Sequence, residues 1–173
     1  MLFRVLGMVF VVGGCSGLGI WYREQLSGRL RAIRSLVRLL EMFMSEISFG
    51  KSTLAESCRE IAQRMEEPYK SVLEQIYREY SVRRTDSFQM ILEQYMRDLF
   101  NKLPLKEEEK TCFCSAFSGQ GFLDGQMQLK CMEQSRKRLE DMVVIQSQEL
   151  KEKSRMAMGL GVMSGLLLVV IML

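Results

Sequence analysis

Residues 26–47 read LSGRLRAIRSLVRLLEMFMSEI and carry the clearest helical pattern in the chain. Apolar residues recur there at alternating spacings of four and three, which is the period of one face of an α-helix. These residues are Leu26, Leu30, Ile33, Val37, Leu40, Met44 and Ile47. Arginines and Glu41 occupy the other faces, and Gly50 is placed to end the helix. Because so regular a stripe requires helical partners, the stretch predicts a helix bundle.

The region that follows this stretch contains several local signals for the starts and ends of helices. Thr53 and Glu56 have the spacing of a capping box, which predicts the start of a second helix. Pro68 suits the first turn of a third helix, because proline is tolerated at that position. Asp86 is expected to cap a fourth helix, and Pro104 is expected to end it. The two prolines of the chain therefore separate helices and interrupt none of them.

The last part of the central region predicts two more helices. Acidic residues at 107–109 complement the dipole of a fifth helix, with Phe113 and Phe117 on its buried side. A sixth helix is expected from about Asp124, and nothing stops it before Leu173, so it spans about 75 Å. No alternation of period two extends far enough to suggest a strand. The sequence therefore predicts an all-α fold, a six-helix bundle.

Two uncharged runs of 18 residues flank the bundle, at 5–22 and 156–173. As a helix, each run is about 27 Å long, close to the hydrocarbon thickness of a bilayer. Basic residues follow the first run and precede the second, and the positive-inside rule then places the central region in the cytoplasm. We therefore expect an N-terminal transmembrane helix within 1–22, a cytoplasmic helical bundle over 23–155, and a C-terminal transmembrane helix over 156–173.

Small residues spaced four apart occur in both apolar runs. Gly13 and Gly17 form a G-x-x-x-G pair in the first run, and Gly161 and Gly165 have the same spacing in the second. They are candidates for packing of membrane helices, although glycine is frequent in such segments in any case. Cys15 follows a small residue, as in a lipoprotein processing site. A retained membrane helix is nevertheless the preferred interpretation, because the apolar run continues past this cysteine.

The composition gives no support for catalysis. The chain has no His, which is the commonest general base and the commonest metal ligand. Its five cysteines lack the spacing of a disulfide framework or a zinc site. No glycine loop has the flanking strand and lysine of a phosphate-binding site. A net charge of only +3 gives no support for a nucleic-acid partner. We therefore expect a non-enzymatic protein with no metal, no cofactor and no nucleic-acid partner.

Motifs along essentially the whole chain resemble, in the same order, the family of stage III sporulation protein AB. The motifs are Arg29-Leu-Arg-Ala-Ile-Arg34, Glu46-Ile-Ser-Phe-Gly50, Thr53-Leu54, Leu103-Pro-Leu105, and Gly121-Phe-Leu-Asp124 followed by Gln128-Leu129. Two features depart from the family pattern: no proline stands between Thr53 and Leu54, and Gly119-Gln120 stands where an apolar residue is expected before Gly121.

The resemblance implies a role in endospore formation. Members of the family belong to a channel complex that links mother cell and forespore, and their helical domain is similar to that of the type II secretion platform protein, the F component. It implies that the chain recruits a secretion-type ATPase, stage III sporulation protein AA. It also implies a site in the mother-cell membrane that faces the forespore, beside other membrane components of the complex. The alternative is a structural channel component with its domain in the intermembrane space.

Seven polar residues are candidates for partner binding: Arg31, Arg34, Glu41, Glu46, Glu56, Asp124 and Gln128. The arginines have a second interpretation, as a topology signal that contacts anionic lipid heads. The acidic residues also have a second interpretation, as solvated or paired groups along helices. Asp124 is also suited to cap the last helix. A second copy of the chain is a further candidate partner.

Overall fold

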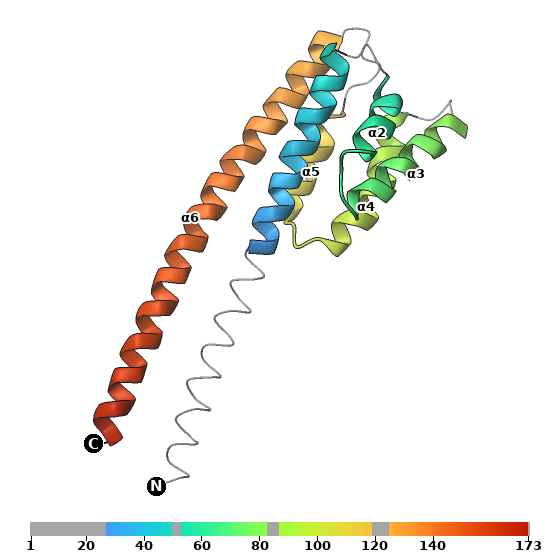
Figure 1. Cartoon of the computed structure of the whole chain (residues 1–173). Helices are drawn as coiled ribbons and strands as arrows, with labels where there is room; N and C mark the ends of the chain where they lie inside the picture. The colour runs from blue at the N-terminus through green and yellow to red at the C-terminus, as the bar shows by residue number, and fades with distance from the viewer. Residues whose placement is uncertain (1–26, 50–52, 83–86, 119–124, 173) are drawn as a thin grey trace. The chain divides into compact units, whose positions relative to one another are not determined.

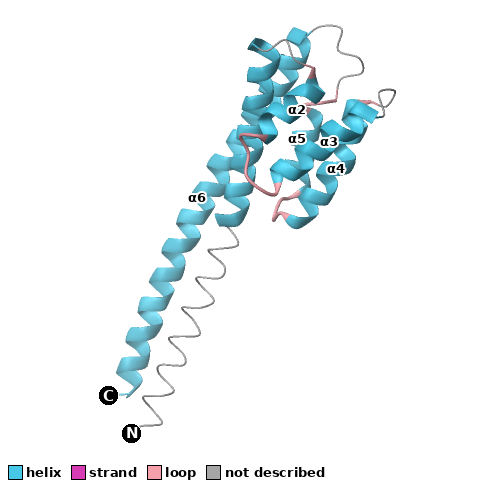
Figure 2. Ribbon diagram, turned by 45° about the vertical axis from the view of Figure 1, so that its right-hand side comes forward, coloured by secondary structure: helices cyan, strands magenta, loops and turns pink. Residues whose placement is uncertain are grey.

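The computed structural model of the chain is helical throughout the residues that it describes, and it has six helices and no strand there (Figures 1 and 2). The described residues are 27–49, 53–82, 87–118 and 125–172, without the side chains of 154 and of residues from 157 onward. The predicted all-α fold is therefore confirmed.

The chain divides into two compact units, one of residues 31–143 and one of residues 1–30 with 144–173. Within the described residues, no helix is both long enough and apolar enough to cross a membrane. The predicted N-terminal membrane helix, with Gly13 and Gly17, lies outside the described residues. Residues 156–172, from the predicted C-terminal one, belong to α6, Gly125–Met172. Of Gly161 and Gly165 only the backbone is described.

The first described helix covers residues 27–49, as its leucine-, arginine- and methionine-rich sequence favours. Its buried face is broader than the predicted stripe. Leu36 and Phe43 are fully buried, whereas Val37 and Met44, which the stripe placed inward, are only partly buried. Several helices pack on this one, so residues beside a two-helix seam are also covered. Leu26 and Gly50 lie outside the described residues.

Four shorter helices complete the core of the unit of residues 31–143. They are α2 (Leu54–Ala62), α3 (Tyr69–Val82), α4 (Phe88–Lys102) and α5 (Glu107–Ser115). Each packs against the next along the chain, α2 on α3, α3 on α4, and α4 on α5 (Figure 1). One continuous apolar cluster joins residues from all four with residues of helix 27–49 and α6.

The predicted boundaries of these helices are largely confirmed. Thr53 caps α2, Pro68 directly precedes α3, and Pro104 lies just beyond the end of α4. The predicted cap of α4 is wrong, because the N-cap residue is Ser87 and not Asp86, which lies outside the described residues. The side chain of Gln89, in the first turn of α4, donates to Glu93 of the same helix, at 2.8 Å.

Aromatic side chains tie α5 to the first helix. Phe43 meets Phe117 edge-on with 5.1 Å between ring centroids, and Phe113 lies 5.4 Å from Phe117. Edge-to-face geometry brings the positive ring edge to the negative face of its neighbour, which adds to the gain from burial. Phe113 and Phe117 are therefore core residues, as the sequence predicts.

The last helix, α6, is uninterrupted over 48 residues, a length of about 72 Å. Its first half lies beside helix 27–49 in both views (Figures 1 and 2). The buried positions of α6 follow the predicted helical period and include polar residues as well as apolar ones. They are Gln128, Met132, Ser135, Leu139 and Gln146.

Candidate protein–protein interface

The outward face of helix 27–49 is basic. Arg31, Arg34 and Arg38 share this face, because residues three, four and seven apart lie above one another on a helix. All three are exposed, and none forms an ion pair with a residue that the structure describes. Their donors are therefore available to an anionic partner, whether a carboxylate or a lipid phosphate.

Glu41 contributes to an ion-pair cluster between helix 27–49 and α6. At its centre is Arg136, whose side chain is only 19% exposed. Its guanidinium lies 3.7 Å from the carboxylate of Glu41 and 2.9 Å from that of Glu133, and it also bonds Glu140. The hydrogen bond from Arg136 lowers the pKa of Glu133, so this carboxylate stays ionised at neutral pH. Glu41 thus helps to hold the two long helices in register.

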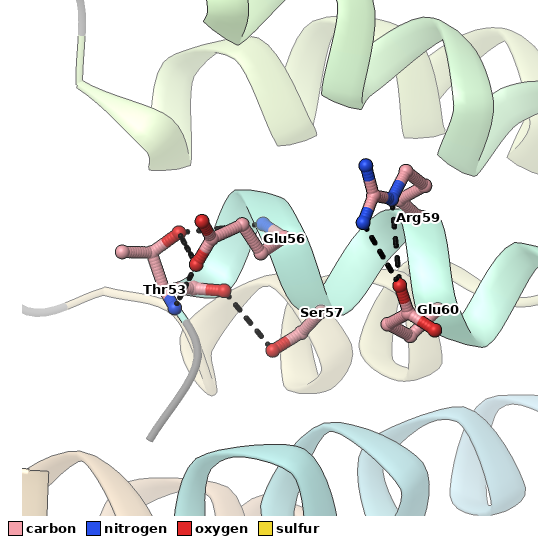
Figure 3. A network of polar contacts seen from close by, with 5 residues as sticks. All are labelled: Thr53, Glu56, Ser57, Arg59 and Glu60. Atoms are coloured by element: carbon pink, nitrogen blue, oxygen red, sulfur yellow. Dashed lines mark hydrogen bonds and ion pairs between the residues drawn. The ribbon is translucent and has the colours of Figure 1, made fainter. Parts of the chain in front are cut away.

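Glu46 and Glu56 also have partners within the chain. The carboxylate of Glu46 lies 3.2 Å from the guanidinium of Arg64, just beyond α2, and its side chain is only 15% exposed. Glu56 accepts hydrogen bonds from the backbone N–H and the hydroxyl of Thr53, at 2.9 and 3.0 Å (Figure 3). The bond from the Thr53 backbone lowers the pKa of Glu56. The predicted capping box is therefore confirmed.

The last two predicted partner-binding residues lie at the start of α6. Asp124 is outside the described residues. Gln128 is 7% exposed, and its Nε2 has no hydrogen-bond partner among the described residues. Arg31 and Arg34 are thus the predicted residues that are exposed and without an ion pair among the described residues. The six predicted residues that the structure describes do not form one patch.

Sequence reasoning missed one feature of this surface, an open groove between the end of helix 27–49 and the start of α6. Its lining includes Met44, Phe49 and Leu129. Phe49 keeps 86% of its surface exposed. One signal was available: Phe49 falls off the apolar stripe that Met44 and Ile47 follow, and a large apolar residue off the stripe is expected to face solvent.

Burial makes three of the described thiols weak nucleophiles. Burial raises the pKa of Cys58 and of Cys112. Burial, with a smaller effect of the Glu93 carboxylate, raises the pKa of Cys114 to about 11. Since the thiolate is the reactive form, these groups are protonated at neutral pH. Among the described residues, no group of three or more Cys, Asp or Glu side chains is placed to hold a metal ion.

The described residues thus define a helical bundle with an unpaired basic face, a class of fold suited to binding other proteins or membranes. The family model of stage III sporulation protein AB matches residues 4–173. The chain therefore belongs to this family, as its motifs suggest, and membership supports a role in sporulation.

The fold is also known from a solved structure. A stage III sporulation protein AB structure is 22% identical, with a TM-score of 0.63, and the match covers 72% of this chain and 97% of that one. At this identity the likeness shows a shared fold. No curated protein sequence matches the chain.

Proposed function

We propose that the chain is a non-enzymatic membrane platform of the sporulation complex, and that its helical bundle recruits a secretion-type ATPase of the stage III sporulation protein AA kind. Family membership over residues 4–173 is the observation that carries this proposal. The ATPase would dock on the basic face of helix 27–49, where Arg31 and Arg34 are exposed and without ion pairs among the described residues.

Two membrane helices would anchor the platform. The uncharged runs at 5–22 and 156–173 have the length that a bilayer requires. Their basic flanks favour a cytoplasmic bundle in the mother-cell membrane that faces the forespore, and the same arginines would also contact anionic lipid heads. The two membrane helices would pack against each other, or against other membrane components of the complex, through their paired glycines. These are Gly13 and Gly17 in the first helix and Gly161 and Gly165 in the second.

The long helix α6 would connect ATPase docking to the membrane. It is helical without a break from Gly125 to Met172. A tilt or push on its first half would therefore pass along a stiff element. Inserting a flexible Gly/Ser segment near Lys151 should abolish sporulation while the protein is still made at its normal level. Full sporulation with this insertion would remove the mechanical part of the proposal.

Docking is tested by measuring ATPase binding to the full chain in lipid nanodiscs. Reversing two charges, Arg31→Glu with Arg34→Glu, should weaken binding about tenfold or more, because like charges then face each other. The matched control reverses two exposed basic residues elsewhere, Lys70→Glu with Lys102→Glu, and should change little. Equal binding by the two double variants would contradict docking on this face.

The alternative function is a structural channel component whose domain lies in the intermembrane space. It requires the bundle on the other side of the membrane, against the basic flanks of both apolar runs. It predicts no contact with a cytoplasmic ATPase. A second copy of the chain as partner is compatible with either function.

A further inference from the structure

The groove between the end of helix 27–49 and the start of α6 is large enough to hold side chains of another molecule. Its volume is about 490 Å³, within the range of about 300–1,000 Å³ that is typical of ligand-binding clefts. Met44, Ser48 and Phe49 line one side, and Leu129, Lys130 and Glu133 line the other. All of them belong to the unit of residues 31–143.

The apolar part of this groove is unusually exposed. Phe49 keeps 86% of its surface in contact with solvent, and Met127, two residues before Leu129, keeps 59%. Aromatic side chains beside a pocket are the residues that most often anchor protein interfaces, because burial of a ring removes much apolar surface from water. Phe49 is thus available to pack on apolar side chains from outside the chain.

The two charged residues that line the groove, Lys130 and Glu133, differ in their pairing. The carboxylate of Glu133 lies 2.9 Å from the guanidinium of Arg136, which also pairs with Glu41 and Glu140, and 3.5 Å from the ammonium of Lys137. Lys130 is exposed and has no ion pair with any residue in the described part of the chain. Arg38, equally unpaired among those residues, lies on the same face of its helix as Phe49, about three turns earlier. An occupant of the groove therefore meets apolar side chains together with one ammonium, that of Lys130, that has no ion pair among the described residues.

We propose that this groove binds an amphipathic acidic segment of a partner protein, with its apolar side chains on Phe49, Met44 and Leu129 and a carboxylate on Lys130. Charge complementarity selects this occupant over a basic or an uncharged apolar segment, because either of those leaves the ammonium of Lys130 covered and unpaired. The site is separate from Arg31 and Arg34. The groove is thus a second binding site beside the basic face proposed for the ATPase. The two sites are tested by substituting different residues.

The test uses the full chain in nanodiscs and three fluorescent helical peptides of about 16 residues. The first carries a Leu/Phe face flanked by Glu, the second has the same face flanked by Lys, and the third keeps Glu but replaces the apolar face with Ser. We expect the first to bind most tightly. Phe49→Ser should weaken its binding about tenfold or more, as for an interface anchor.

Charge reversal gives the sharper readout. Lys130→Glu should weaken the Glu peptide about tenfold and strengthen the Lys peptide, which loss of structure could not do. Val82→Ser, at a residue that is 82% exposed on α3, and Lys70→Glu are the matched controls and should leave binding unchanged. Because Phe49 and Lys130 are both exposed, helix content measured by circular dichroism should match the parent in each variant.

Two results would overturn the proposal. One is equal binding of the three peptides, or binding that neither Phe49→Ser nor Lys130→Glu alters. The other is self-association of the full chain that depends on Phe49 and that the Glu peptide does not displace, which would assign the groove to a second copy. Either result leaves ATPase docking on Arg31 and Arg34 untouched, so the two proposals fail independently.

Discussion

Helix 27–49 and α6 are both long and both follow a three–four spacing, but their buried faces differ in chemistry. The buried face of the first helix is apolar, and the side chains of Ile33, Leu36 and Phe43 are fully buried. Along α6, the polar residues Gln128 and Ser135 alternate with apolar ones at the buried positions. Equal periodicity therefore hides two different roles: the first helix forms the centre of the core, and α6 packs on it through a mixed seam.

The polar residues of the α6 seam limit how it can pack. The Ser135 carbonyl accepts a hydrogen bond from the Cys112 thiol at 3.6 Å, and Arg136 joins three carboxylates across the two long helices. Buried polar groups cost free energy unless they are paired, and pairing is lost when two helices slip in register. The mixed seam thus trades stability for a defined alignment.

The largest effect should come from the apolar face of helix 27–49. Phe43→Ala removes a fully buried ring that packs on Phe117 and leaves a cavity, at an expected cost of about 3–5 kcal/mol in the free energy of unfolding. Urea unfolding of the full chain in detergent measures it. Phe49→Ala is the matched control on the same helix and should cost little, since Phe49 is exposed. Similar losses for the two variants would disprove the assignment of inner and outer faces.

A smaller effect of opposite sign is expected on α6. Gln128→Leu removes a buried amide whose Nε2 has no partner in the described part of the chain, and should raise the free energy of unfolding by about 1 kcal/mol. Gln134→Leu, at an exposed position two turns further along α6, should change stability by no more than about 0.5 kcal/mol. A loss of stability in Gln128→Leu would show that this amide is paired, and would weaken the contrast between the two seams.

An effect of about the same size is expected away from both long helices, at the cap of α2. Thr53→Ala should cost about 1 kcal/mol, the usual value for loss of an N-cap hydroxyl, whereas Ser52→Ala next to it should cost less. Thermal unfolding at neutral pH measures both. A larger loss of stability in Ser52→Ala than in Thr53→Ala would show that Thr53 is not the cap.

The same cap gives a pH dependence. Because the folded chain lowers the pKa of Glu56, its contribution to stability is complete above the ordinary carboxyl pKa and disappears as the pH falls through the lowered one. Glu56→Gln should therefore be less stable than the parent at pH 7, and the difference should shrink by pH 3. A difference that grows on acidification would contradict the sign of this shift.

The sequence was sufficient to predict the order of the helices, because their ends carry local signals. Thr53, Pro68 and Pro104 act within a few residues, and the structure places them at helix ends as predicted. The predicted stripe on helix 27–49 was too narrow, since the number of helices that cover Leu36 and Phe43 depends on tertiary packing. A periodic pattern gives the direction of a buried face more reliably than its width.

The candidate site was harder to predict, because ion pairing depends on residues far apart in the sequence. Glu41 and Glu46 resemble Arg31 and Arg34 as charged residues on one helix, yet their partners Arg136 and Arg64 come from elsewhere in the chain. Only the folded structure separates paired from unpaired charges. The groove beside Phe49 likewise needs the start of α6 to form its second side.

Accessibility of residue 70 in living cells tests the platform account most directly. Lys70 is exposed near the start of α3. Lys70→Cys, in a chain whose five native cysteines are replaced by alanine, would be treated with a membrane-impermeant maleimide in intact and in lysed protoplasts. If the bundle lies in the cytoplasm, as proposed, labelling should occur only after lysis. Labelling in intact protoplasts would place the bundle outside, contradict ATPase recruitment, and favour the structural channel component.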